Sequence, residues 1–246
     1  MQPIFRRSYE IRDHEVDRFG RLKPSAILYF AQDAAGFHCD QLALGHDILA
    51  GRGLFWAVTR HKVQITRLPM RGETITLETW PLPTTRVAYP RSTVAYDADG
   101  HELFRSISLW VLMDINTRAL VLPGKSGVEV TGLLRGSELA VPNSLTPRTL
   151  SNERVCTVAF TELDRNGHMN NCSYMDWISN LLPSEFHSSH PVKEFTVCYL
   201  SEAREGQTIQ LHWELSADGV LRVDGGREEP AGQNGHMRVF SAQLLL

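Results

Sequence analysis

The chain contains 246 residues, of which 42% are hydrophobic and 22% are charged, and its formal net charge is −3. These values are typical of a globular protein and exclude a disordered, collagen-like or coiled-coil chain. No apolar run approaches the roughly 20 residues that a membrane-spanning helix needs, so we expect no membrane span. The acidic total and the dispersed basic residues also argue against a nucleic-acid partner.

The spacing of the cysteines and histidines bears on whether the chain contains a metal site. The four cysteines form no C-x-x-C pair and the histidines form no H-x-x-x-H pattern, so no metal site is predicted. The chain contains no glycine-rich nucleotide-binding loop, so no cofactor is predicted. The low cysteine content, together with Arg6 ahead of any apolar core, favours a cytoplasmic protein without a secretory signal.

The predicted elements begin with a short strand over 8–11 and a helix that starts at Pro24, because proline suits the first helical position. Apolar residues then recur at helical spacing as far as Leu42. Four β-rich runs follow, at residues 55–66, 74–80, 86–96 and 104–113. The proline-bearing segment 141–147 is the predicted linker.

The second half of the chain repeats this order. A strand over 155–160 precedes a helix that Asn170 and Asn171 can cap, and Pro183 stops that helix. Four β-rich runs again follow, at residues 194–200, 208–215, 219–223 and 236–246.

Sequence matches between the halves indicate a duplication. Residues 15–22 (EVDRFGRL) match residues 162–169 (ELDRNGHM), and residues 72–77 (GETITL) match residues 206–211 (GQTIQL). The matches keep the same order and only two copies exist, so the pattern favours a duplicated domain over a solenoid.

A helix followed by an antiparallel sheet is an α+β arrangement in which the sheet wraps the helix. We therefore predict a tandem (double) hotdog, with an N-terminal hotdog over 1–140 and a C-terminal hotdog over 148–246. The two helix-wrapped antiparallel sheets would form an intrachain pseudo-dimer. A single irregular mixed domain is the alternative.

The two copies differ inside the matched loop. Phe19 and Arg21 of the first copy correspond to Asn166 and His168 of the second. In an extended loop, side chains at alternate positions such as Asp164, Asn166 and His168 would face one way. That layout suits polarisation of a carbonyl group, and the free N–H groups of the following helix would stabilise an oxyanion.

A structural interpretation of this loop stays open beside the catalytic one. Asp, Asn and Gly residues also shape turns and cap helices without any catalytic role. Asp164 has a counterpart in Asp17, which indicates that part of its role is structural in both copies. Asn166 and His168 have no such counterparts, and for them we favour function.

The motif over 164–171 (DRNGHMNN) resembles the signature of the acyl-acyl carrier protein thioesterases of plants and bacteria. Residues 54–60, 67–72 and 108–114 resemble further segments of that family, so the resemblance spans nearly the whole chain. Tyr199–Ala203 resembles the family segment that carries a catalytic glutamate, here Glu202. Hydratases of the same fold use D-x-N-x-x-H, which has one residue more between Asn and His.

The resemblance implies hydrolysis of a fatty acyl thioester on acyl carrier protein, with release of the free fatty acid. It implies Asp164, Asn166, His168 and Glu202 as the catalytic set. Plant members commonly have a cysteine directly after the glutamate, whereas this chain has Ala203, so no cysteine nucleophile exists at that position. We expect an activated water instead, with either Glu202 or His168 as the base.

The resemblance also suggests how the two halves divide the work. Residues 52–91 carry seven basic and two acidic side chains, which indicates a surface for an acidic carrier protein or, equally, an ordinary solvated face. The acyl chain would lie beside the first helix near Phe30, Ala34 and Phe37, although a core role fits them as well.

Two rivals remain open at this point. An acyl-CoA thioesterase would use the same site with a different partner surface, and a non-catalytic acyl-binding hotdog protein would bind ligand without releasing thiol. The quaternary state is expected to be a monomer or a homodimer, because an internal pair of hotdogs can satisfy the need for a second copy.

Overall fold

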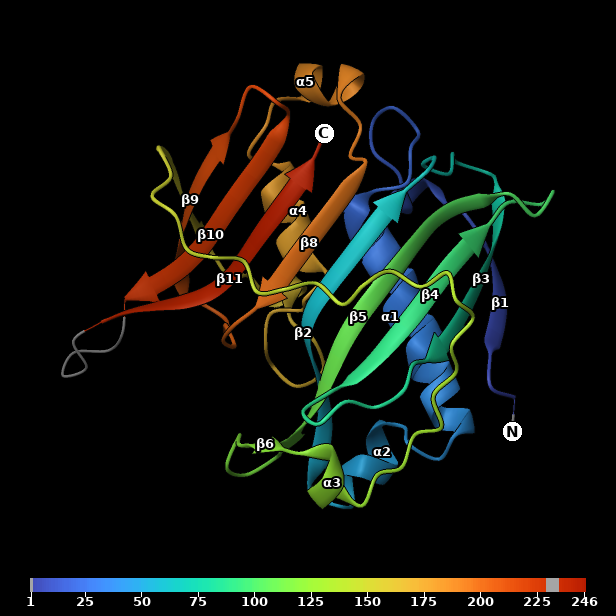
Figure 1. Cartoon of the computed structure of the whole chain (residues 1–246). Coiled ribbons are helices and arrows are strands. Elements are labelled where there is room, and N and C mark those ends of the chain that lie inside the picture. The colour runs from blue at the N-terminus through green and yellow to red at the C-terminus, as the bar shows by residue number, and fades with distance from the viewer. Residues whose placement is uncertain (1, 229–234) are drawn as a thin grey trace. The chain divides into compact units, whose positions relative to one another are not determined.

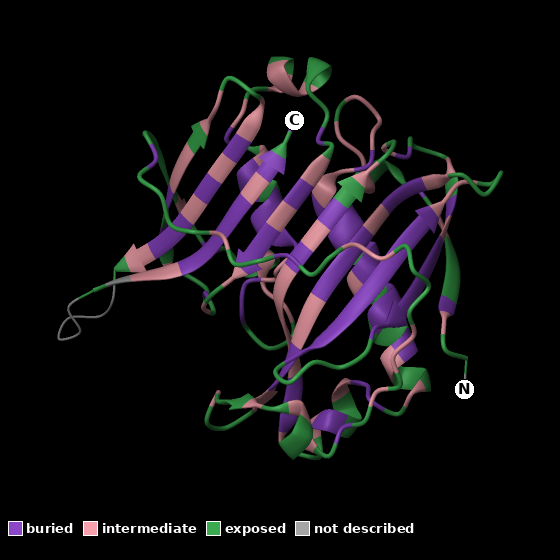
Figure 2. Cartoon of the chain, viewed as in Figure 1, coloured by how far each residue is buried: buried purple, intermediate pink, exposed green. Residues whose placement is uncertain are grey.

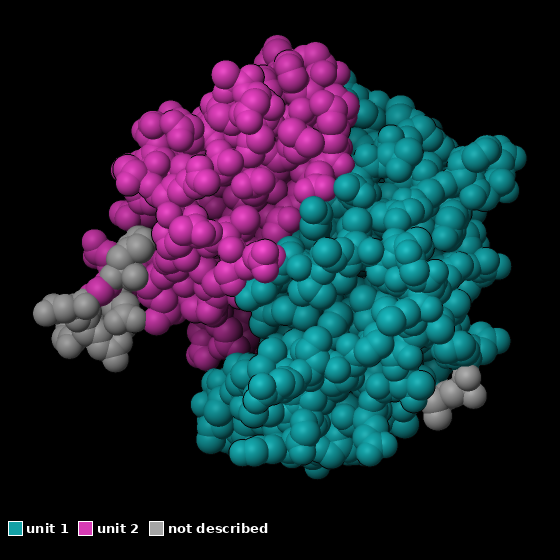
Figure 3. Space-filling model, in the orientation of Figure 1, with its two compact units in different colours: residues 1–142 teal, residues 143–246 magenta. Residues whose placement is uncertain are grey.

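The computed structural model of the protein describes residues 2–228 and 235–246 (Figure 1). The chain divides into two compact units, residues 1–142 and residues 143–246 (Figure 3). None of the described helices has the length and apolar character that crossing a membrane would require.

Unit 1 consists of one long helix and an antiparallel sheet in the order β1–β3–β4–β5–β2. Its main elements are β1 (Phe5–Glu10), α1 (Pro24–Gln41), β2 (Leu54–Ile65), β3 (Thr74–Pro81), β4 (Tyr89–Tyr96) and β5 (Glu102–Asp114). Its short elements are η1 (Asp13–Glu15), α2 (His46–Ala50), β6 (Leu120–Val121) and α3 (Pro123–Ser126).

The sheet of unit 1 is covered on both faces around β4, of which all residues but the last are buried (Figure 2). Helix α1 lies against one face, where His38 contacts Arg91 of β4. On the other face, Leu133 and Leu139 pack on the buried cluster around Trp80. Because both faces of β4 are covered, even its polar side chains Arg91, Ser92 and Thr93 are buried.

Unit 2 repeats the plan with a shorter helix and the strand order β8–β11–β10–β9–β7. Its elements are β7 (Asn152–Thr157), η2 (Phe160–Glu162), α4 (Ser173–Ser179), α5 (Ser184–Ser189), β8 (Glu194–Tyr199), β9 (Thr208–Leu215), β10 (Val220–Glu228) and β11 (His236–Leu245).

The α+β prediction is confirmed, because each unit has one main helix with an antiparallel sheet. The first helix begins at Pro24 as predicted. The second begins at Ser173 with Cys172 as its N-cap, whereas Asn170, predicted as a cap together with Asn171, accepts from Cys172 N in the turn just before the helix. The strand predicted to end at Val223 continues to Glu228.

Candidate active site

Asp164 closes the loop between η2 and α4. Its Oδ1 accepts hydrogen bonds from the backbone N–H of Asn166 (2.8 Å) and of His168 (3.2 Å), and its own N–H donates to the His168 carbonyl (2.7 Å). Gly167 has φ of +76°, the left-handed region that favours glycine. The loop is therefore a tight Asx turn, and the prediction of an extended loop with three side chains facing one way is wrong.

Unit 1 contains the same turn. Asp17 Oδ1 accepts from the backbone N–H of Phe19 (2.8 Å) and Arg21 (3.0 Å), and Gly20 has φ of +75°. The aspartate is thus required by the turn in both copies. The two aspartates differ in their side-chain partner. Asp17 pairs with the Arg21 guanidinium, whereas Asp164 Oδ2 accepts a hydrogen bond from the Asn166 amide (3.2 Å).

His168 and Glu202 come together in unit 2. The His168 Nε2 lies 3.1 Å from Glu202 Oε2, and the two segments are held side by side because Met169 N donates to the Ala203 carbonyl (2.8 Å). The His168 side chain is 10% exposed and the Glu202 side chain 39%. The pair therefore joins a nearly buried imidazole to a carboxylate that solvent reaches.

The matching backbone contact in unit 1 shows what the first copy has at these positions. There Leu22 N donates to the Pro69 carbonyl (2.8 Å), which places Arg21 and Leu68 where unit 2 has His168 and Glu202. An arginine already paired with Asp17 and a leucine cannot provide acid–base chemistry, so the imidazole–carboxylate pair distinguishes unit 2.

Asn166 stands apart from this pair. Its side chain is exposed, and its amide donates to Asp164 rather than to His168 or Glu202. The structure thus brings two of the four predicted residues into direct contact and connects the other two to each other.

The helix-start N–H groups expected to stabilise an oxyanion are largely engaged. Asn170 N donates to the Glu162 carbonyl (2.8 Å), Cys172 N to Asn170 Oδ1 (3.0 Å) and Ser173 N to the Asn170 carbonyl (2.9 Å). That expectation is wrong for these three groups, because the protein's own oxygens occupy them.

The sequence did not predict the hydrogen bond between Glu162 and Trp177. Glu162 Oε1 accepts from Trp177 Nε1 (2.5 Å), and its Oε2 accepts from Ala159 N (2.9 Å). The side chain thereby connects the start of η2 to helix α4, and the Glu162 carbonyl accepts from Asn170 N in the loop that carries His168. The available signal was the repeat, in which Trp177 corresponds to Phe30, a residue that has no N–H to donate.

The buried cysteine and alanine agree with a site that uses no thiol. Cys172 is fully buried, and this burial raises the pKa of its thiol well above the usual value, so the reactive thiolate is disfavoured. Ala203 is also fully buried.

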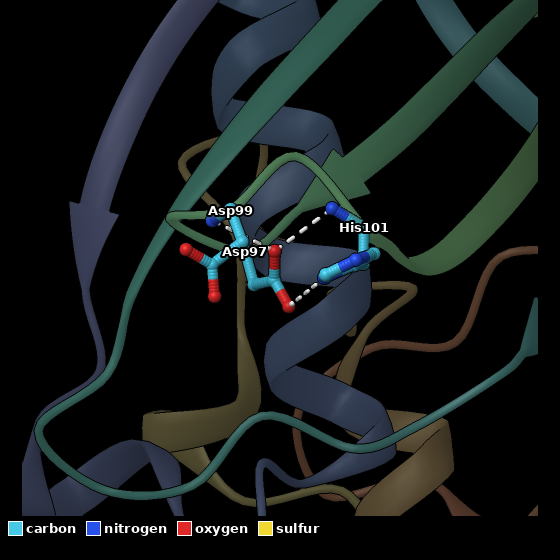
Figure 4. A group of neighbouring side chains, drawn as sticks. All are labelled: Asp97, Asp99 and His101. Atoms are coloured by element: carbon cyan, nitrogen blue, oxygen red, sulfur yellow. Dashed lines mark hydrogen bonds and ion pairs between the residues drawn. The ribbon is translucent and has the colours of Figure 1, made fainter.

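One group of potential metal ligands, Asp97, Asp99 and His101, occupies the turn between β4 and β5 (Figure 4). Asp97 Oδ1 accepts from the backbone N–H of Asp99 (3.0 Å) and His101 (2.8 Å), so it builds this turn. Exposed acidic turns of this kind are explained by their backbone hydrogen bonds, and we assign no metal to the group.

The predicted basic surface over 52–91 is wrong in part. Arg91 is buried, Arg67 pairs with Glu73, and Arg71 pairs with Asp13. Arg52 and Arg86 are exposed.

The three residues predicted to lie beside the acyl chain differ in burial. Phe30 and Ala34 are buried, whereas Phe37 is 39% exposed and stacks on Phe5 of β1 at 6.2 Å between ring centroids. Phe37 therefore lies half-exposed against β1, and its place beside an acyl chain stays a prediction.

Comparison with known proteins agrees with these features. Residues 2–122 match the model of the acyl-ACP thioesterase N-terminal domain, and residues 146–237 match that of the acyl-ACP thioesterase C-terminal domain. The chain is 27% identical to a chloroplastic dodecanoyl-[acyl-carrier-protein] hydrolase of Cinnamomum camphora, over 92% of this chain and 65% of the relative. It is 26% identical to a chloroplastic palmitoyl-acyl carrier protein thioesterase of Gossypium hirsutum, over 94% and 63%. The chain thus spans less than two thirds of the length of these relatives.

Solved structures share the fold over nearly the whole chain. An acyl-ACP thioesterase from Bacteroides thetaiotaomicron superimposes with a TM-score of 0.88 at 21% identity, covering 99% of this chain and 97% of the other. The 12:0-ACP thioesterase from Umbellularia californica gives 0.81 at 24% identity, with the same coverage. With both domain models matched along most of its length, the chain belongs to the acyl-ACP thioesterase family.

Proposed function

We propose that the protein hydrolyses fatty acyl thioesters on acyl carrier protein, releases the free fatty acid and so ends chain elongation. The observation that carries this proposal is the His168–Glu202 pair, which unit 2 has and the duplicate positions of unit 1 lack. Membership of the acyl-ACP thioesterase family supports the thioester as the bond that is cleaved.

In the proposed mechanism Glu202 is the general base. Its partly exposed carboxylate takes a proton from a water molecule as the water oxygen attacks the thioester carbonyl carbon. The tetrahedral intermediate collapses with cleavage of the C–S bond, and the sulfur leaves as a thiol after it receives the proton. The products are a fatty acid and the free phosphopantetheine thiol.

The other three residues position the reactants. His168 holds the Glu202 carboxylate through Nε2 and, together with Asn166, orients the water and the carbonyl oxygen. Asp164 orients Asn166 through its Oδ2. The reverse assignment, with His168 as the base and Glu202 as its orienting partner, predicts a loss of activity from the same substitutions.

The proposed division of labour gives the acyl chain and carrier docking to residues 1–140, and catalysis to residues 148–246. The acidic carrier is still favoured as partner by the exposed Arg52 and Arg86, although the paired and buried arginines remove much of the expected surface. Coenzyme A esters are the alternative substrate, and a competition assay with both carriers separates the two.

The test is thiol release from a panel of acyl carrier protein esters of different lengths. We expect His168→Ala and Glu202→Gln each to lower kcat by a factor of about 10² to 10⁴ while the melting temperature is retained. Arg21→Ala, at the matching position of unit 1, is the control and should keep wild-type turnover. Wild-type rates in both unit 2 variants would exclude this mechanism, and acyl binding without thiol release would favour the non-catalytic rival.

A cytoplasmic location and a monomeric or homodimeric state remain predictions. All four cysteines are free, which fits a reducing compartment. Cell fractionation and light scattering would test the two predictions.

A further inference from the structure

Unit 1 contains a buried cation that the proposed reaction does not use. Arg91 of β4 is 6% exposed and points toward helix α1, where its Nη1 lies 3.1 Å from His38 Nδ1. Its other contacts are Thr79 Oγ1 at 3.4 Å from Nη1 and Cys39 Sγ at 3.8 Å from Nη2. Within the described part of the chain, these contacts include no carboxylate.

The neighbours of Arg91 are electrically neutral. Burial, reinforced by the arginine charge, lowers the pKa of His38, and its Nδ1 can accept from the guanidinium while Nε2 donates to the Gln2 carbonyl (3.2 Å). Burial raises the pKa of Cys39 above its usual value although Arg91 opposes this shift, so the thiol keeps its proton. Arg91 itself stays charged, because a guanidinium is not deprotonated in proteins.

A second buried polar group, His61, lies on the same row of the sheet as Arg91. Arg91 pairs in register with Ser108 of β5, and Ser108 pairs with His61 of β2, so the three side chains lie on one face of the sheet. His61 is 3% exposed, and its Nε2 is buried without a hydrogen-bond partner within the described residues. The face that meets α1 thus presents a cation and an unpartnered imidazole nitrogen.

Buried charges in folded proteins are normally paired, because an unpaired one loses its hydration without compensation. A chain that needed only a filled core would be more stable with an apolar side chain at this position. An anionic group supplied by a ligand would give Arg91 the opposite charge and the bidentate hydrogen bonds that its neutral protein neighbours do not.

We propose that the interior of unit 1 beneath α1 binds the carboxylate of an aliphatic ligand, with Arg91 as the anchoring cation. The aliphatic part of this ligand rests on the proposed function, which places an acyl chain in this half of the protein. The carboxylate has two sources: a free fatty acid, or the distal carboxylate of an ω-carboxyacyl thioester.

The first experiment measures binding without turnover. Isothermal titration of laurate and of dodecanol should give wild-type protein at least a tenfold preference for laurate, because only laurate carries the charge. Arg91→Met should abolish the preference. Arg86→Met, which removes an exposed arginine just before β4, should keep it. The preference should also persist in His168→Ala, which excludes carboxylate binding at the His168–Glu202 pair.

The second measurement separates a ligand-anchoring arginine from a structural one. Without ligand, Arg91→Met should melt at the same temperature as wild type or higher, and laurate should raise the melting temperature of wild type only. Equal binding of laurate and dodecanol by wild type, or a large loss of stability in ligand-free Arg91→Met, would overturn the proposal.

Turnover identifies the source of the carboxylate. If the ligand is a substrate, the ω-carboxydodecanoyl ester of acyl carrier protein should be hydrolysed with a higher kcat/KM than the dodecanoyl ester, and Arg91→Met should reverse that order. If the ligand is a free fatty acid, laurate should inhibit wild type more strongly than Arg91→Met, with no preference for the ω-carboxy ester. Absence of any hydrolysis would reject the proposed function while the binding results stand independently.

Discussion

At the scale of single residues, the site depends on how firmly the His168 loop is held. The Glu162 side chain joins Ala159, just before η2, to Trp177 of α4, and the Glu162 carbonyl accepts from Asn170 N at the end of the His168 loop. The neighbouring turn is held by hydrogen bonds to Asp164, and Met169 N joins it to the Ala203 carbonyl. We therefore regard Glu162 and Trp177 as positioning residues for His168.

Trp177→Phe tests this role because it removes one N–H and keeps the aromatic packing. We expect kcat to fall about tenfold with KM nearly unchanged, since a displaced imidazole affects the reaction more than substrate binding. Steady-state kinetics on an acyl carrier protein ester provide the measurement. The single variant Glu162→Gln, which still offers an acceptor oxygen to the Trp177 indole, should retain most of the wild-type kcat.

A matched control exists in unit 1, where Trp56 Nε1 donates to the Leu44 carbonyl (3.0 Å). Trp56→Phe also removes one indole hydrogen bond and should lower the melting temperature by a similar amount while kcat is retained. If both tryptophan variants lower kcat equally, the effect is one of general stability and Trp177 has no positioning role.

Sequence patterns identified some of these residues and missed others for a physical reason. His168 was found because the repeat exposes a difference from Arg21, and Glu202 because its segment resembles a family motif. Arg91 was assigned to a surface, because composition counts charges without regard to the face of the strand on which they lie. Its burial is set by α1, which packs on that face from elsewhere in the chain.

At the scale of elements, the two Asx turns form a natural pair of experiments. Asp164→Ala and Asp17→Ala each remove the acceptor of two backbone N–H groups, so each should destabilise its unit by about 1–2 kcal/mol. Only Asp164→Ala should also lower kcat/KM, since only that turn carries His168. Thermal melts and thiol-release assays on the two variants measure both effects.

An equal loss of activity in Asp17→Ala would contradict the assignment of chemistry to unit 2. Unchanged stability in both variants would show that the backbone groups find other acceptors. The turn itself was only partly predictable: Gly167 and Asp164 signalled it, but alternation of polar residues suggested an extended loop. Side chains at alternate positions face the same way only where the backbone is an extended strand. In this loop the hydrogen bonds to Asp164 bend the backbone into a turn, so the alternation does not apply.

At the scale of the whole molecule, the fold followed from features that repeat. The helix at Pro24 and the long strands were predicted because their apolar periodicity extends over many residues. The short helices α2, α3 and α5 were not, because four to six residues carry too little periodicity to recognise. The start of α4 at Ser173 depends on the turn at Asn170, which only the folded chain defines.

The stability of the protein should depend on pH through His61. Burial lowers the pKa of His61 to about 4, whereas the unfolded chain binds a proton near pH 6.5. Between these values the unfolded state binds more protons than the folded state, so stability is complete above about pH 6.5 and declines as the pH falls. At pH 5 the loss from this residue is about 2 kcal/mol, or roughly 4–8 °C in melting temperature.

His61→Leu should remove this part of the pH dependence, because leucine fills the buried position without a titrating group. Thermal melts at pH 7.5 and pH 5.0 should therefore differ less for His61→Leu than for wild type. His14→Gln, which alters an exposed histidine, should keep the wild-type difference. An unchanged difference in His61→Leu would mean that His61 stays accessible to protons in the folded state, and the buried row beside Arg91 would then be open to water.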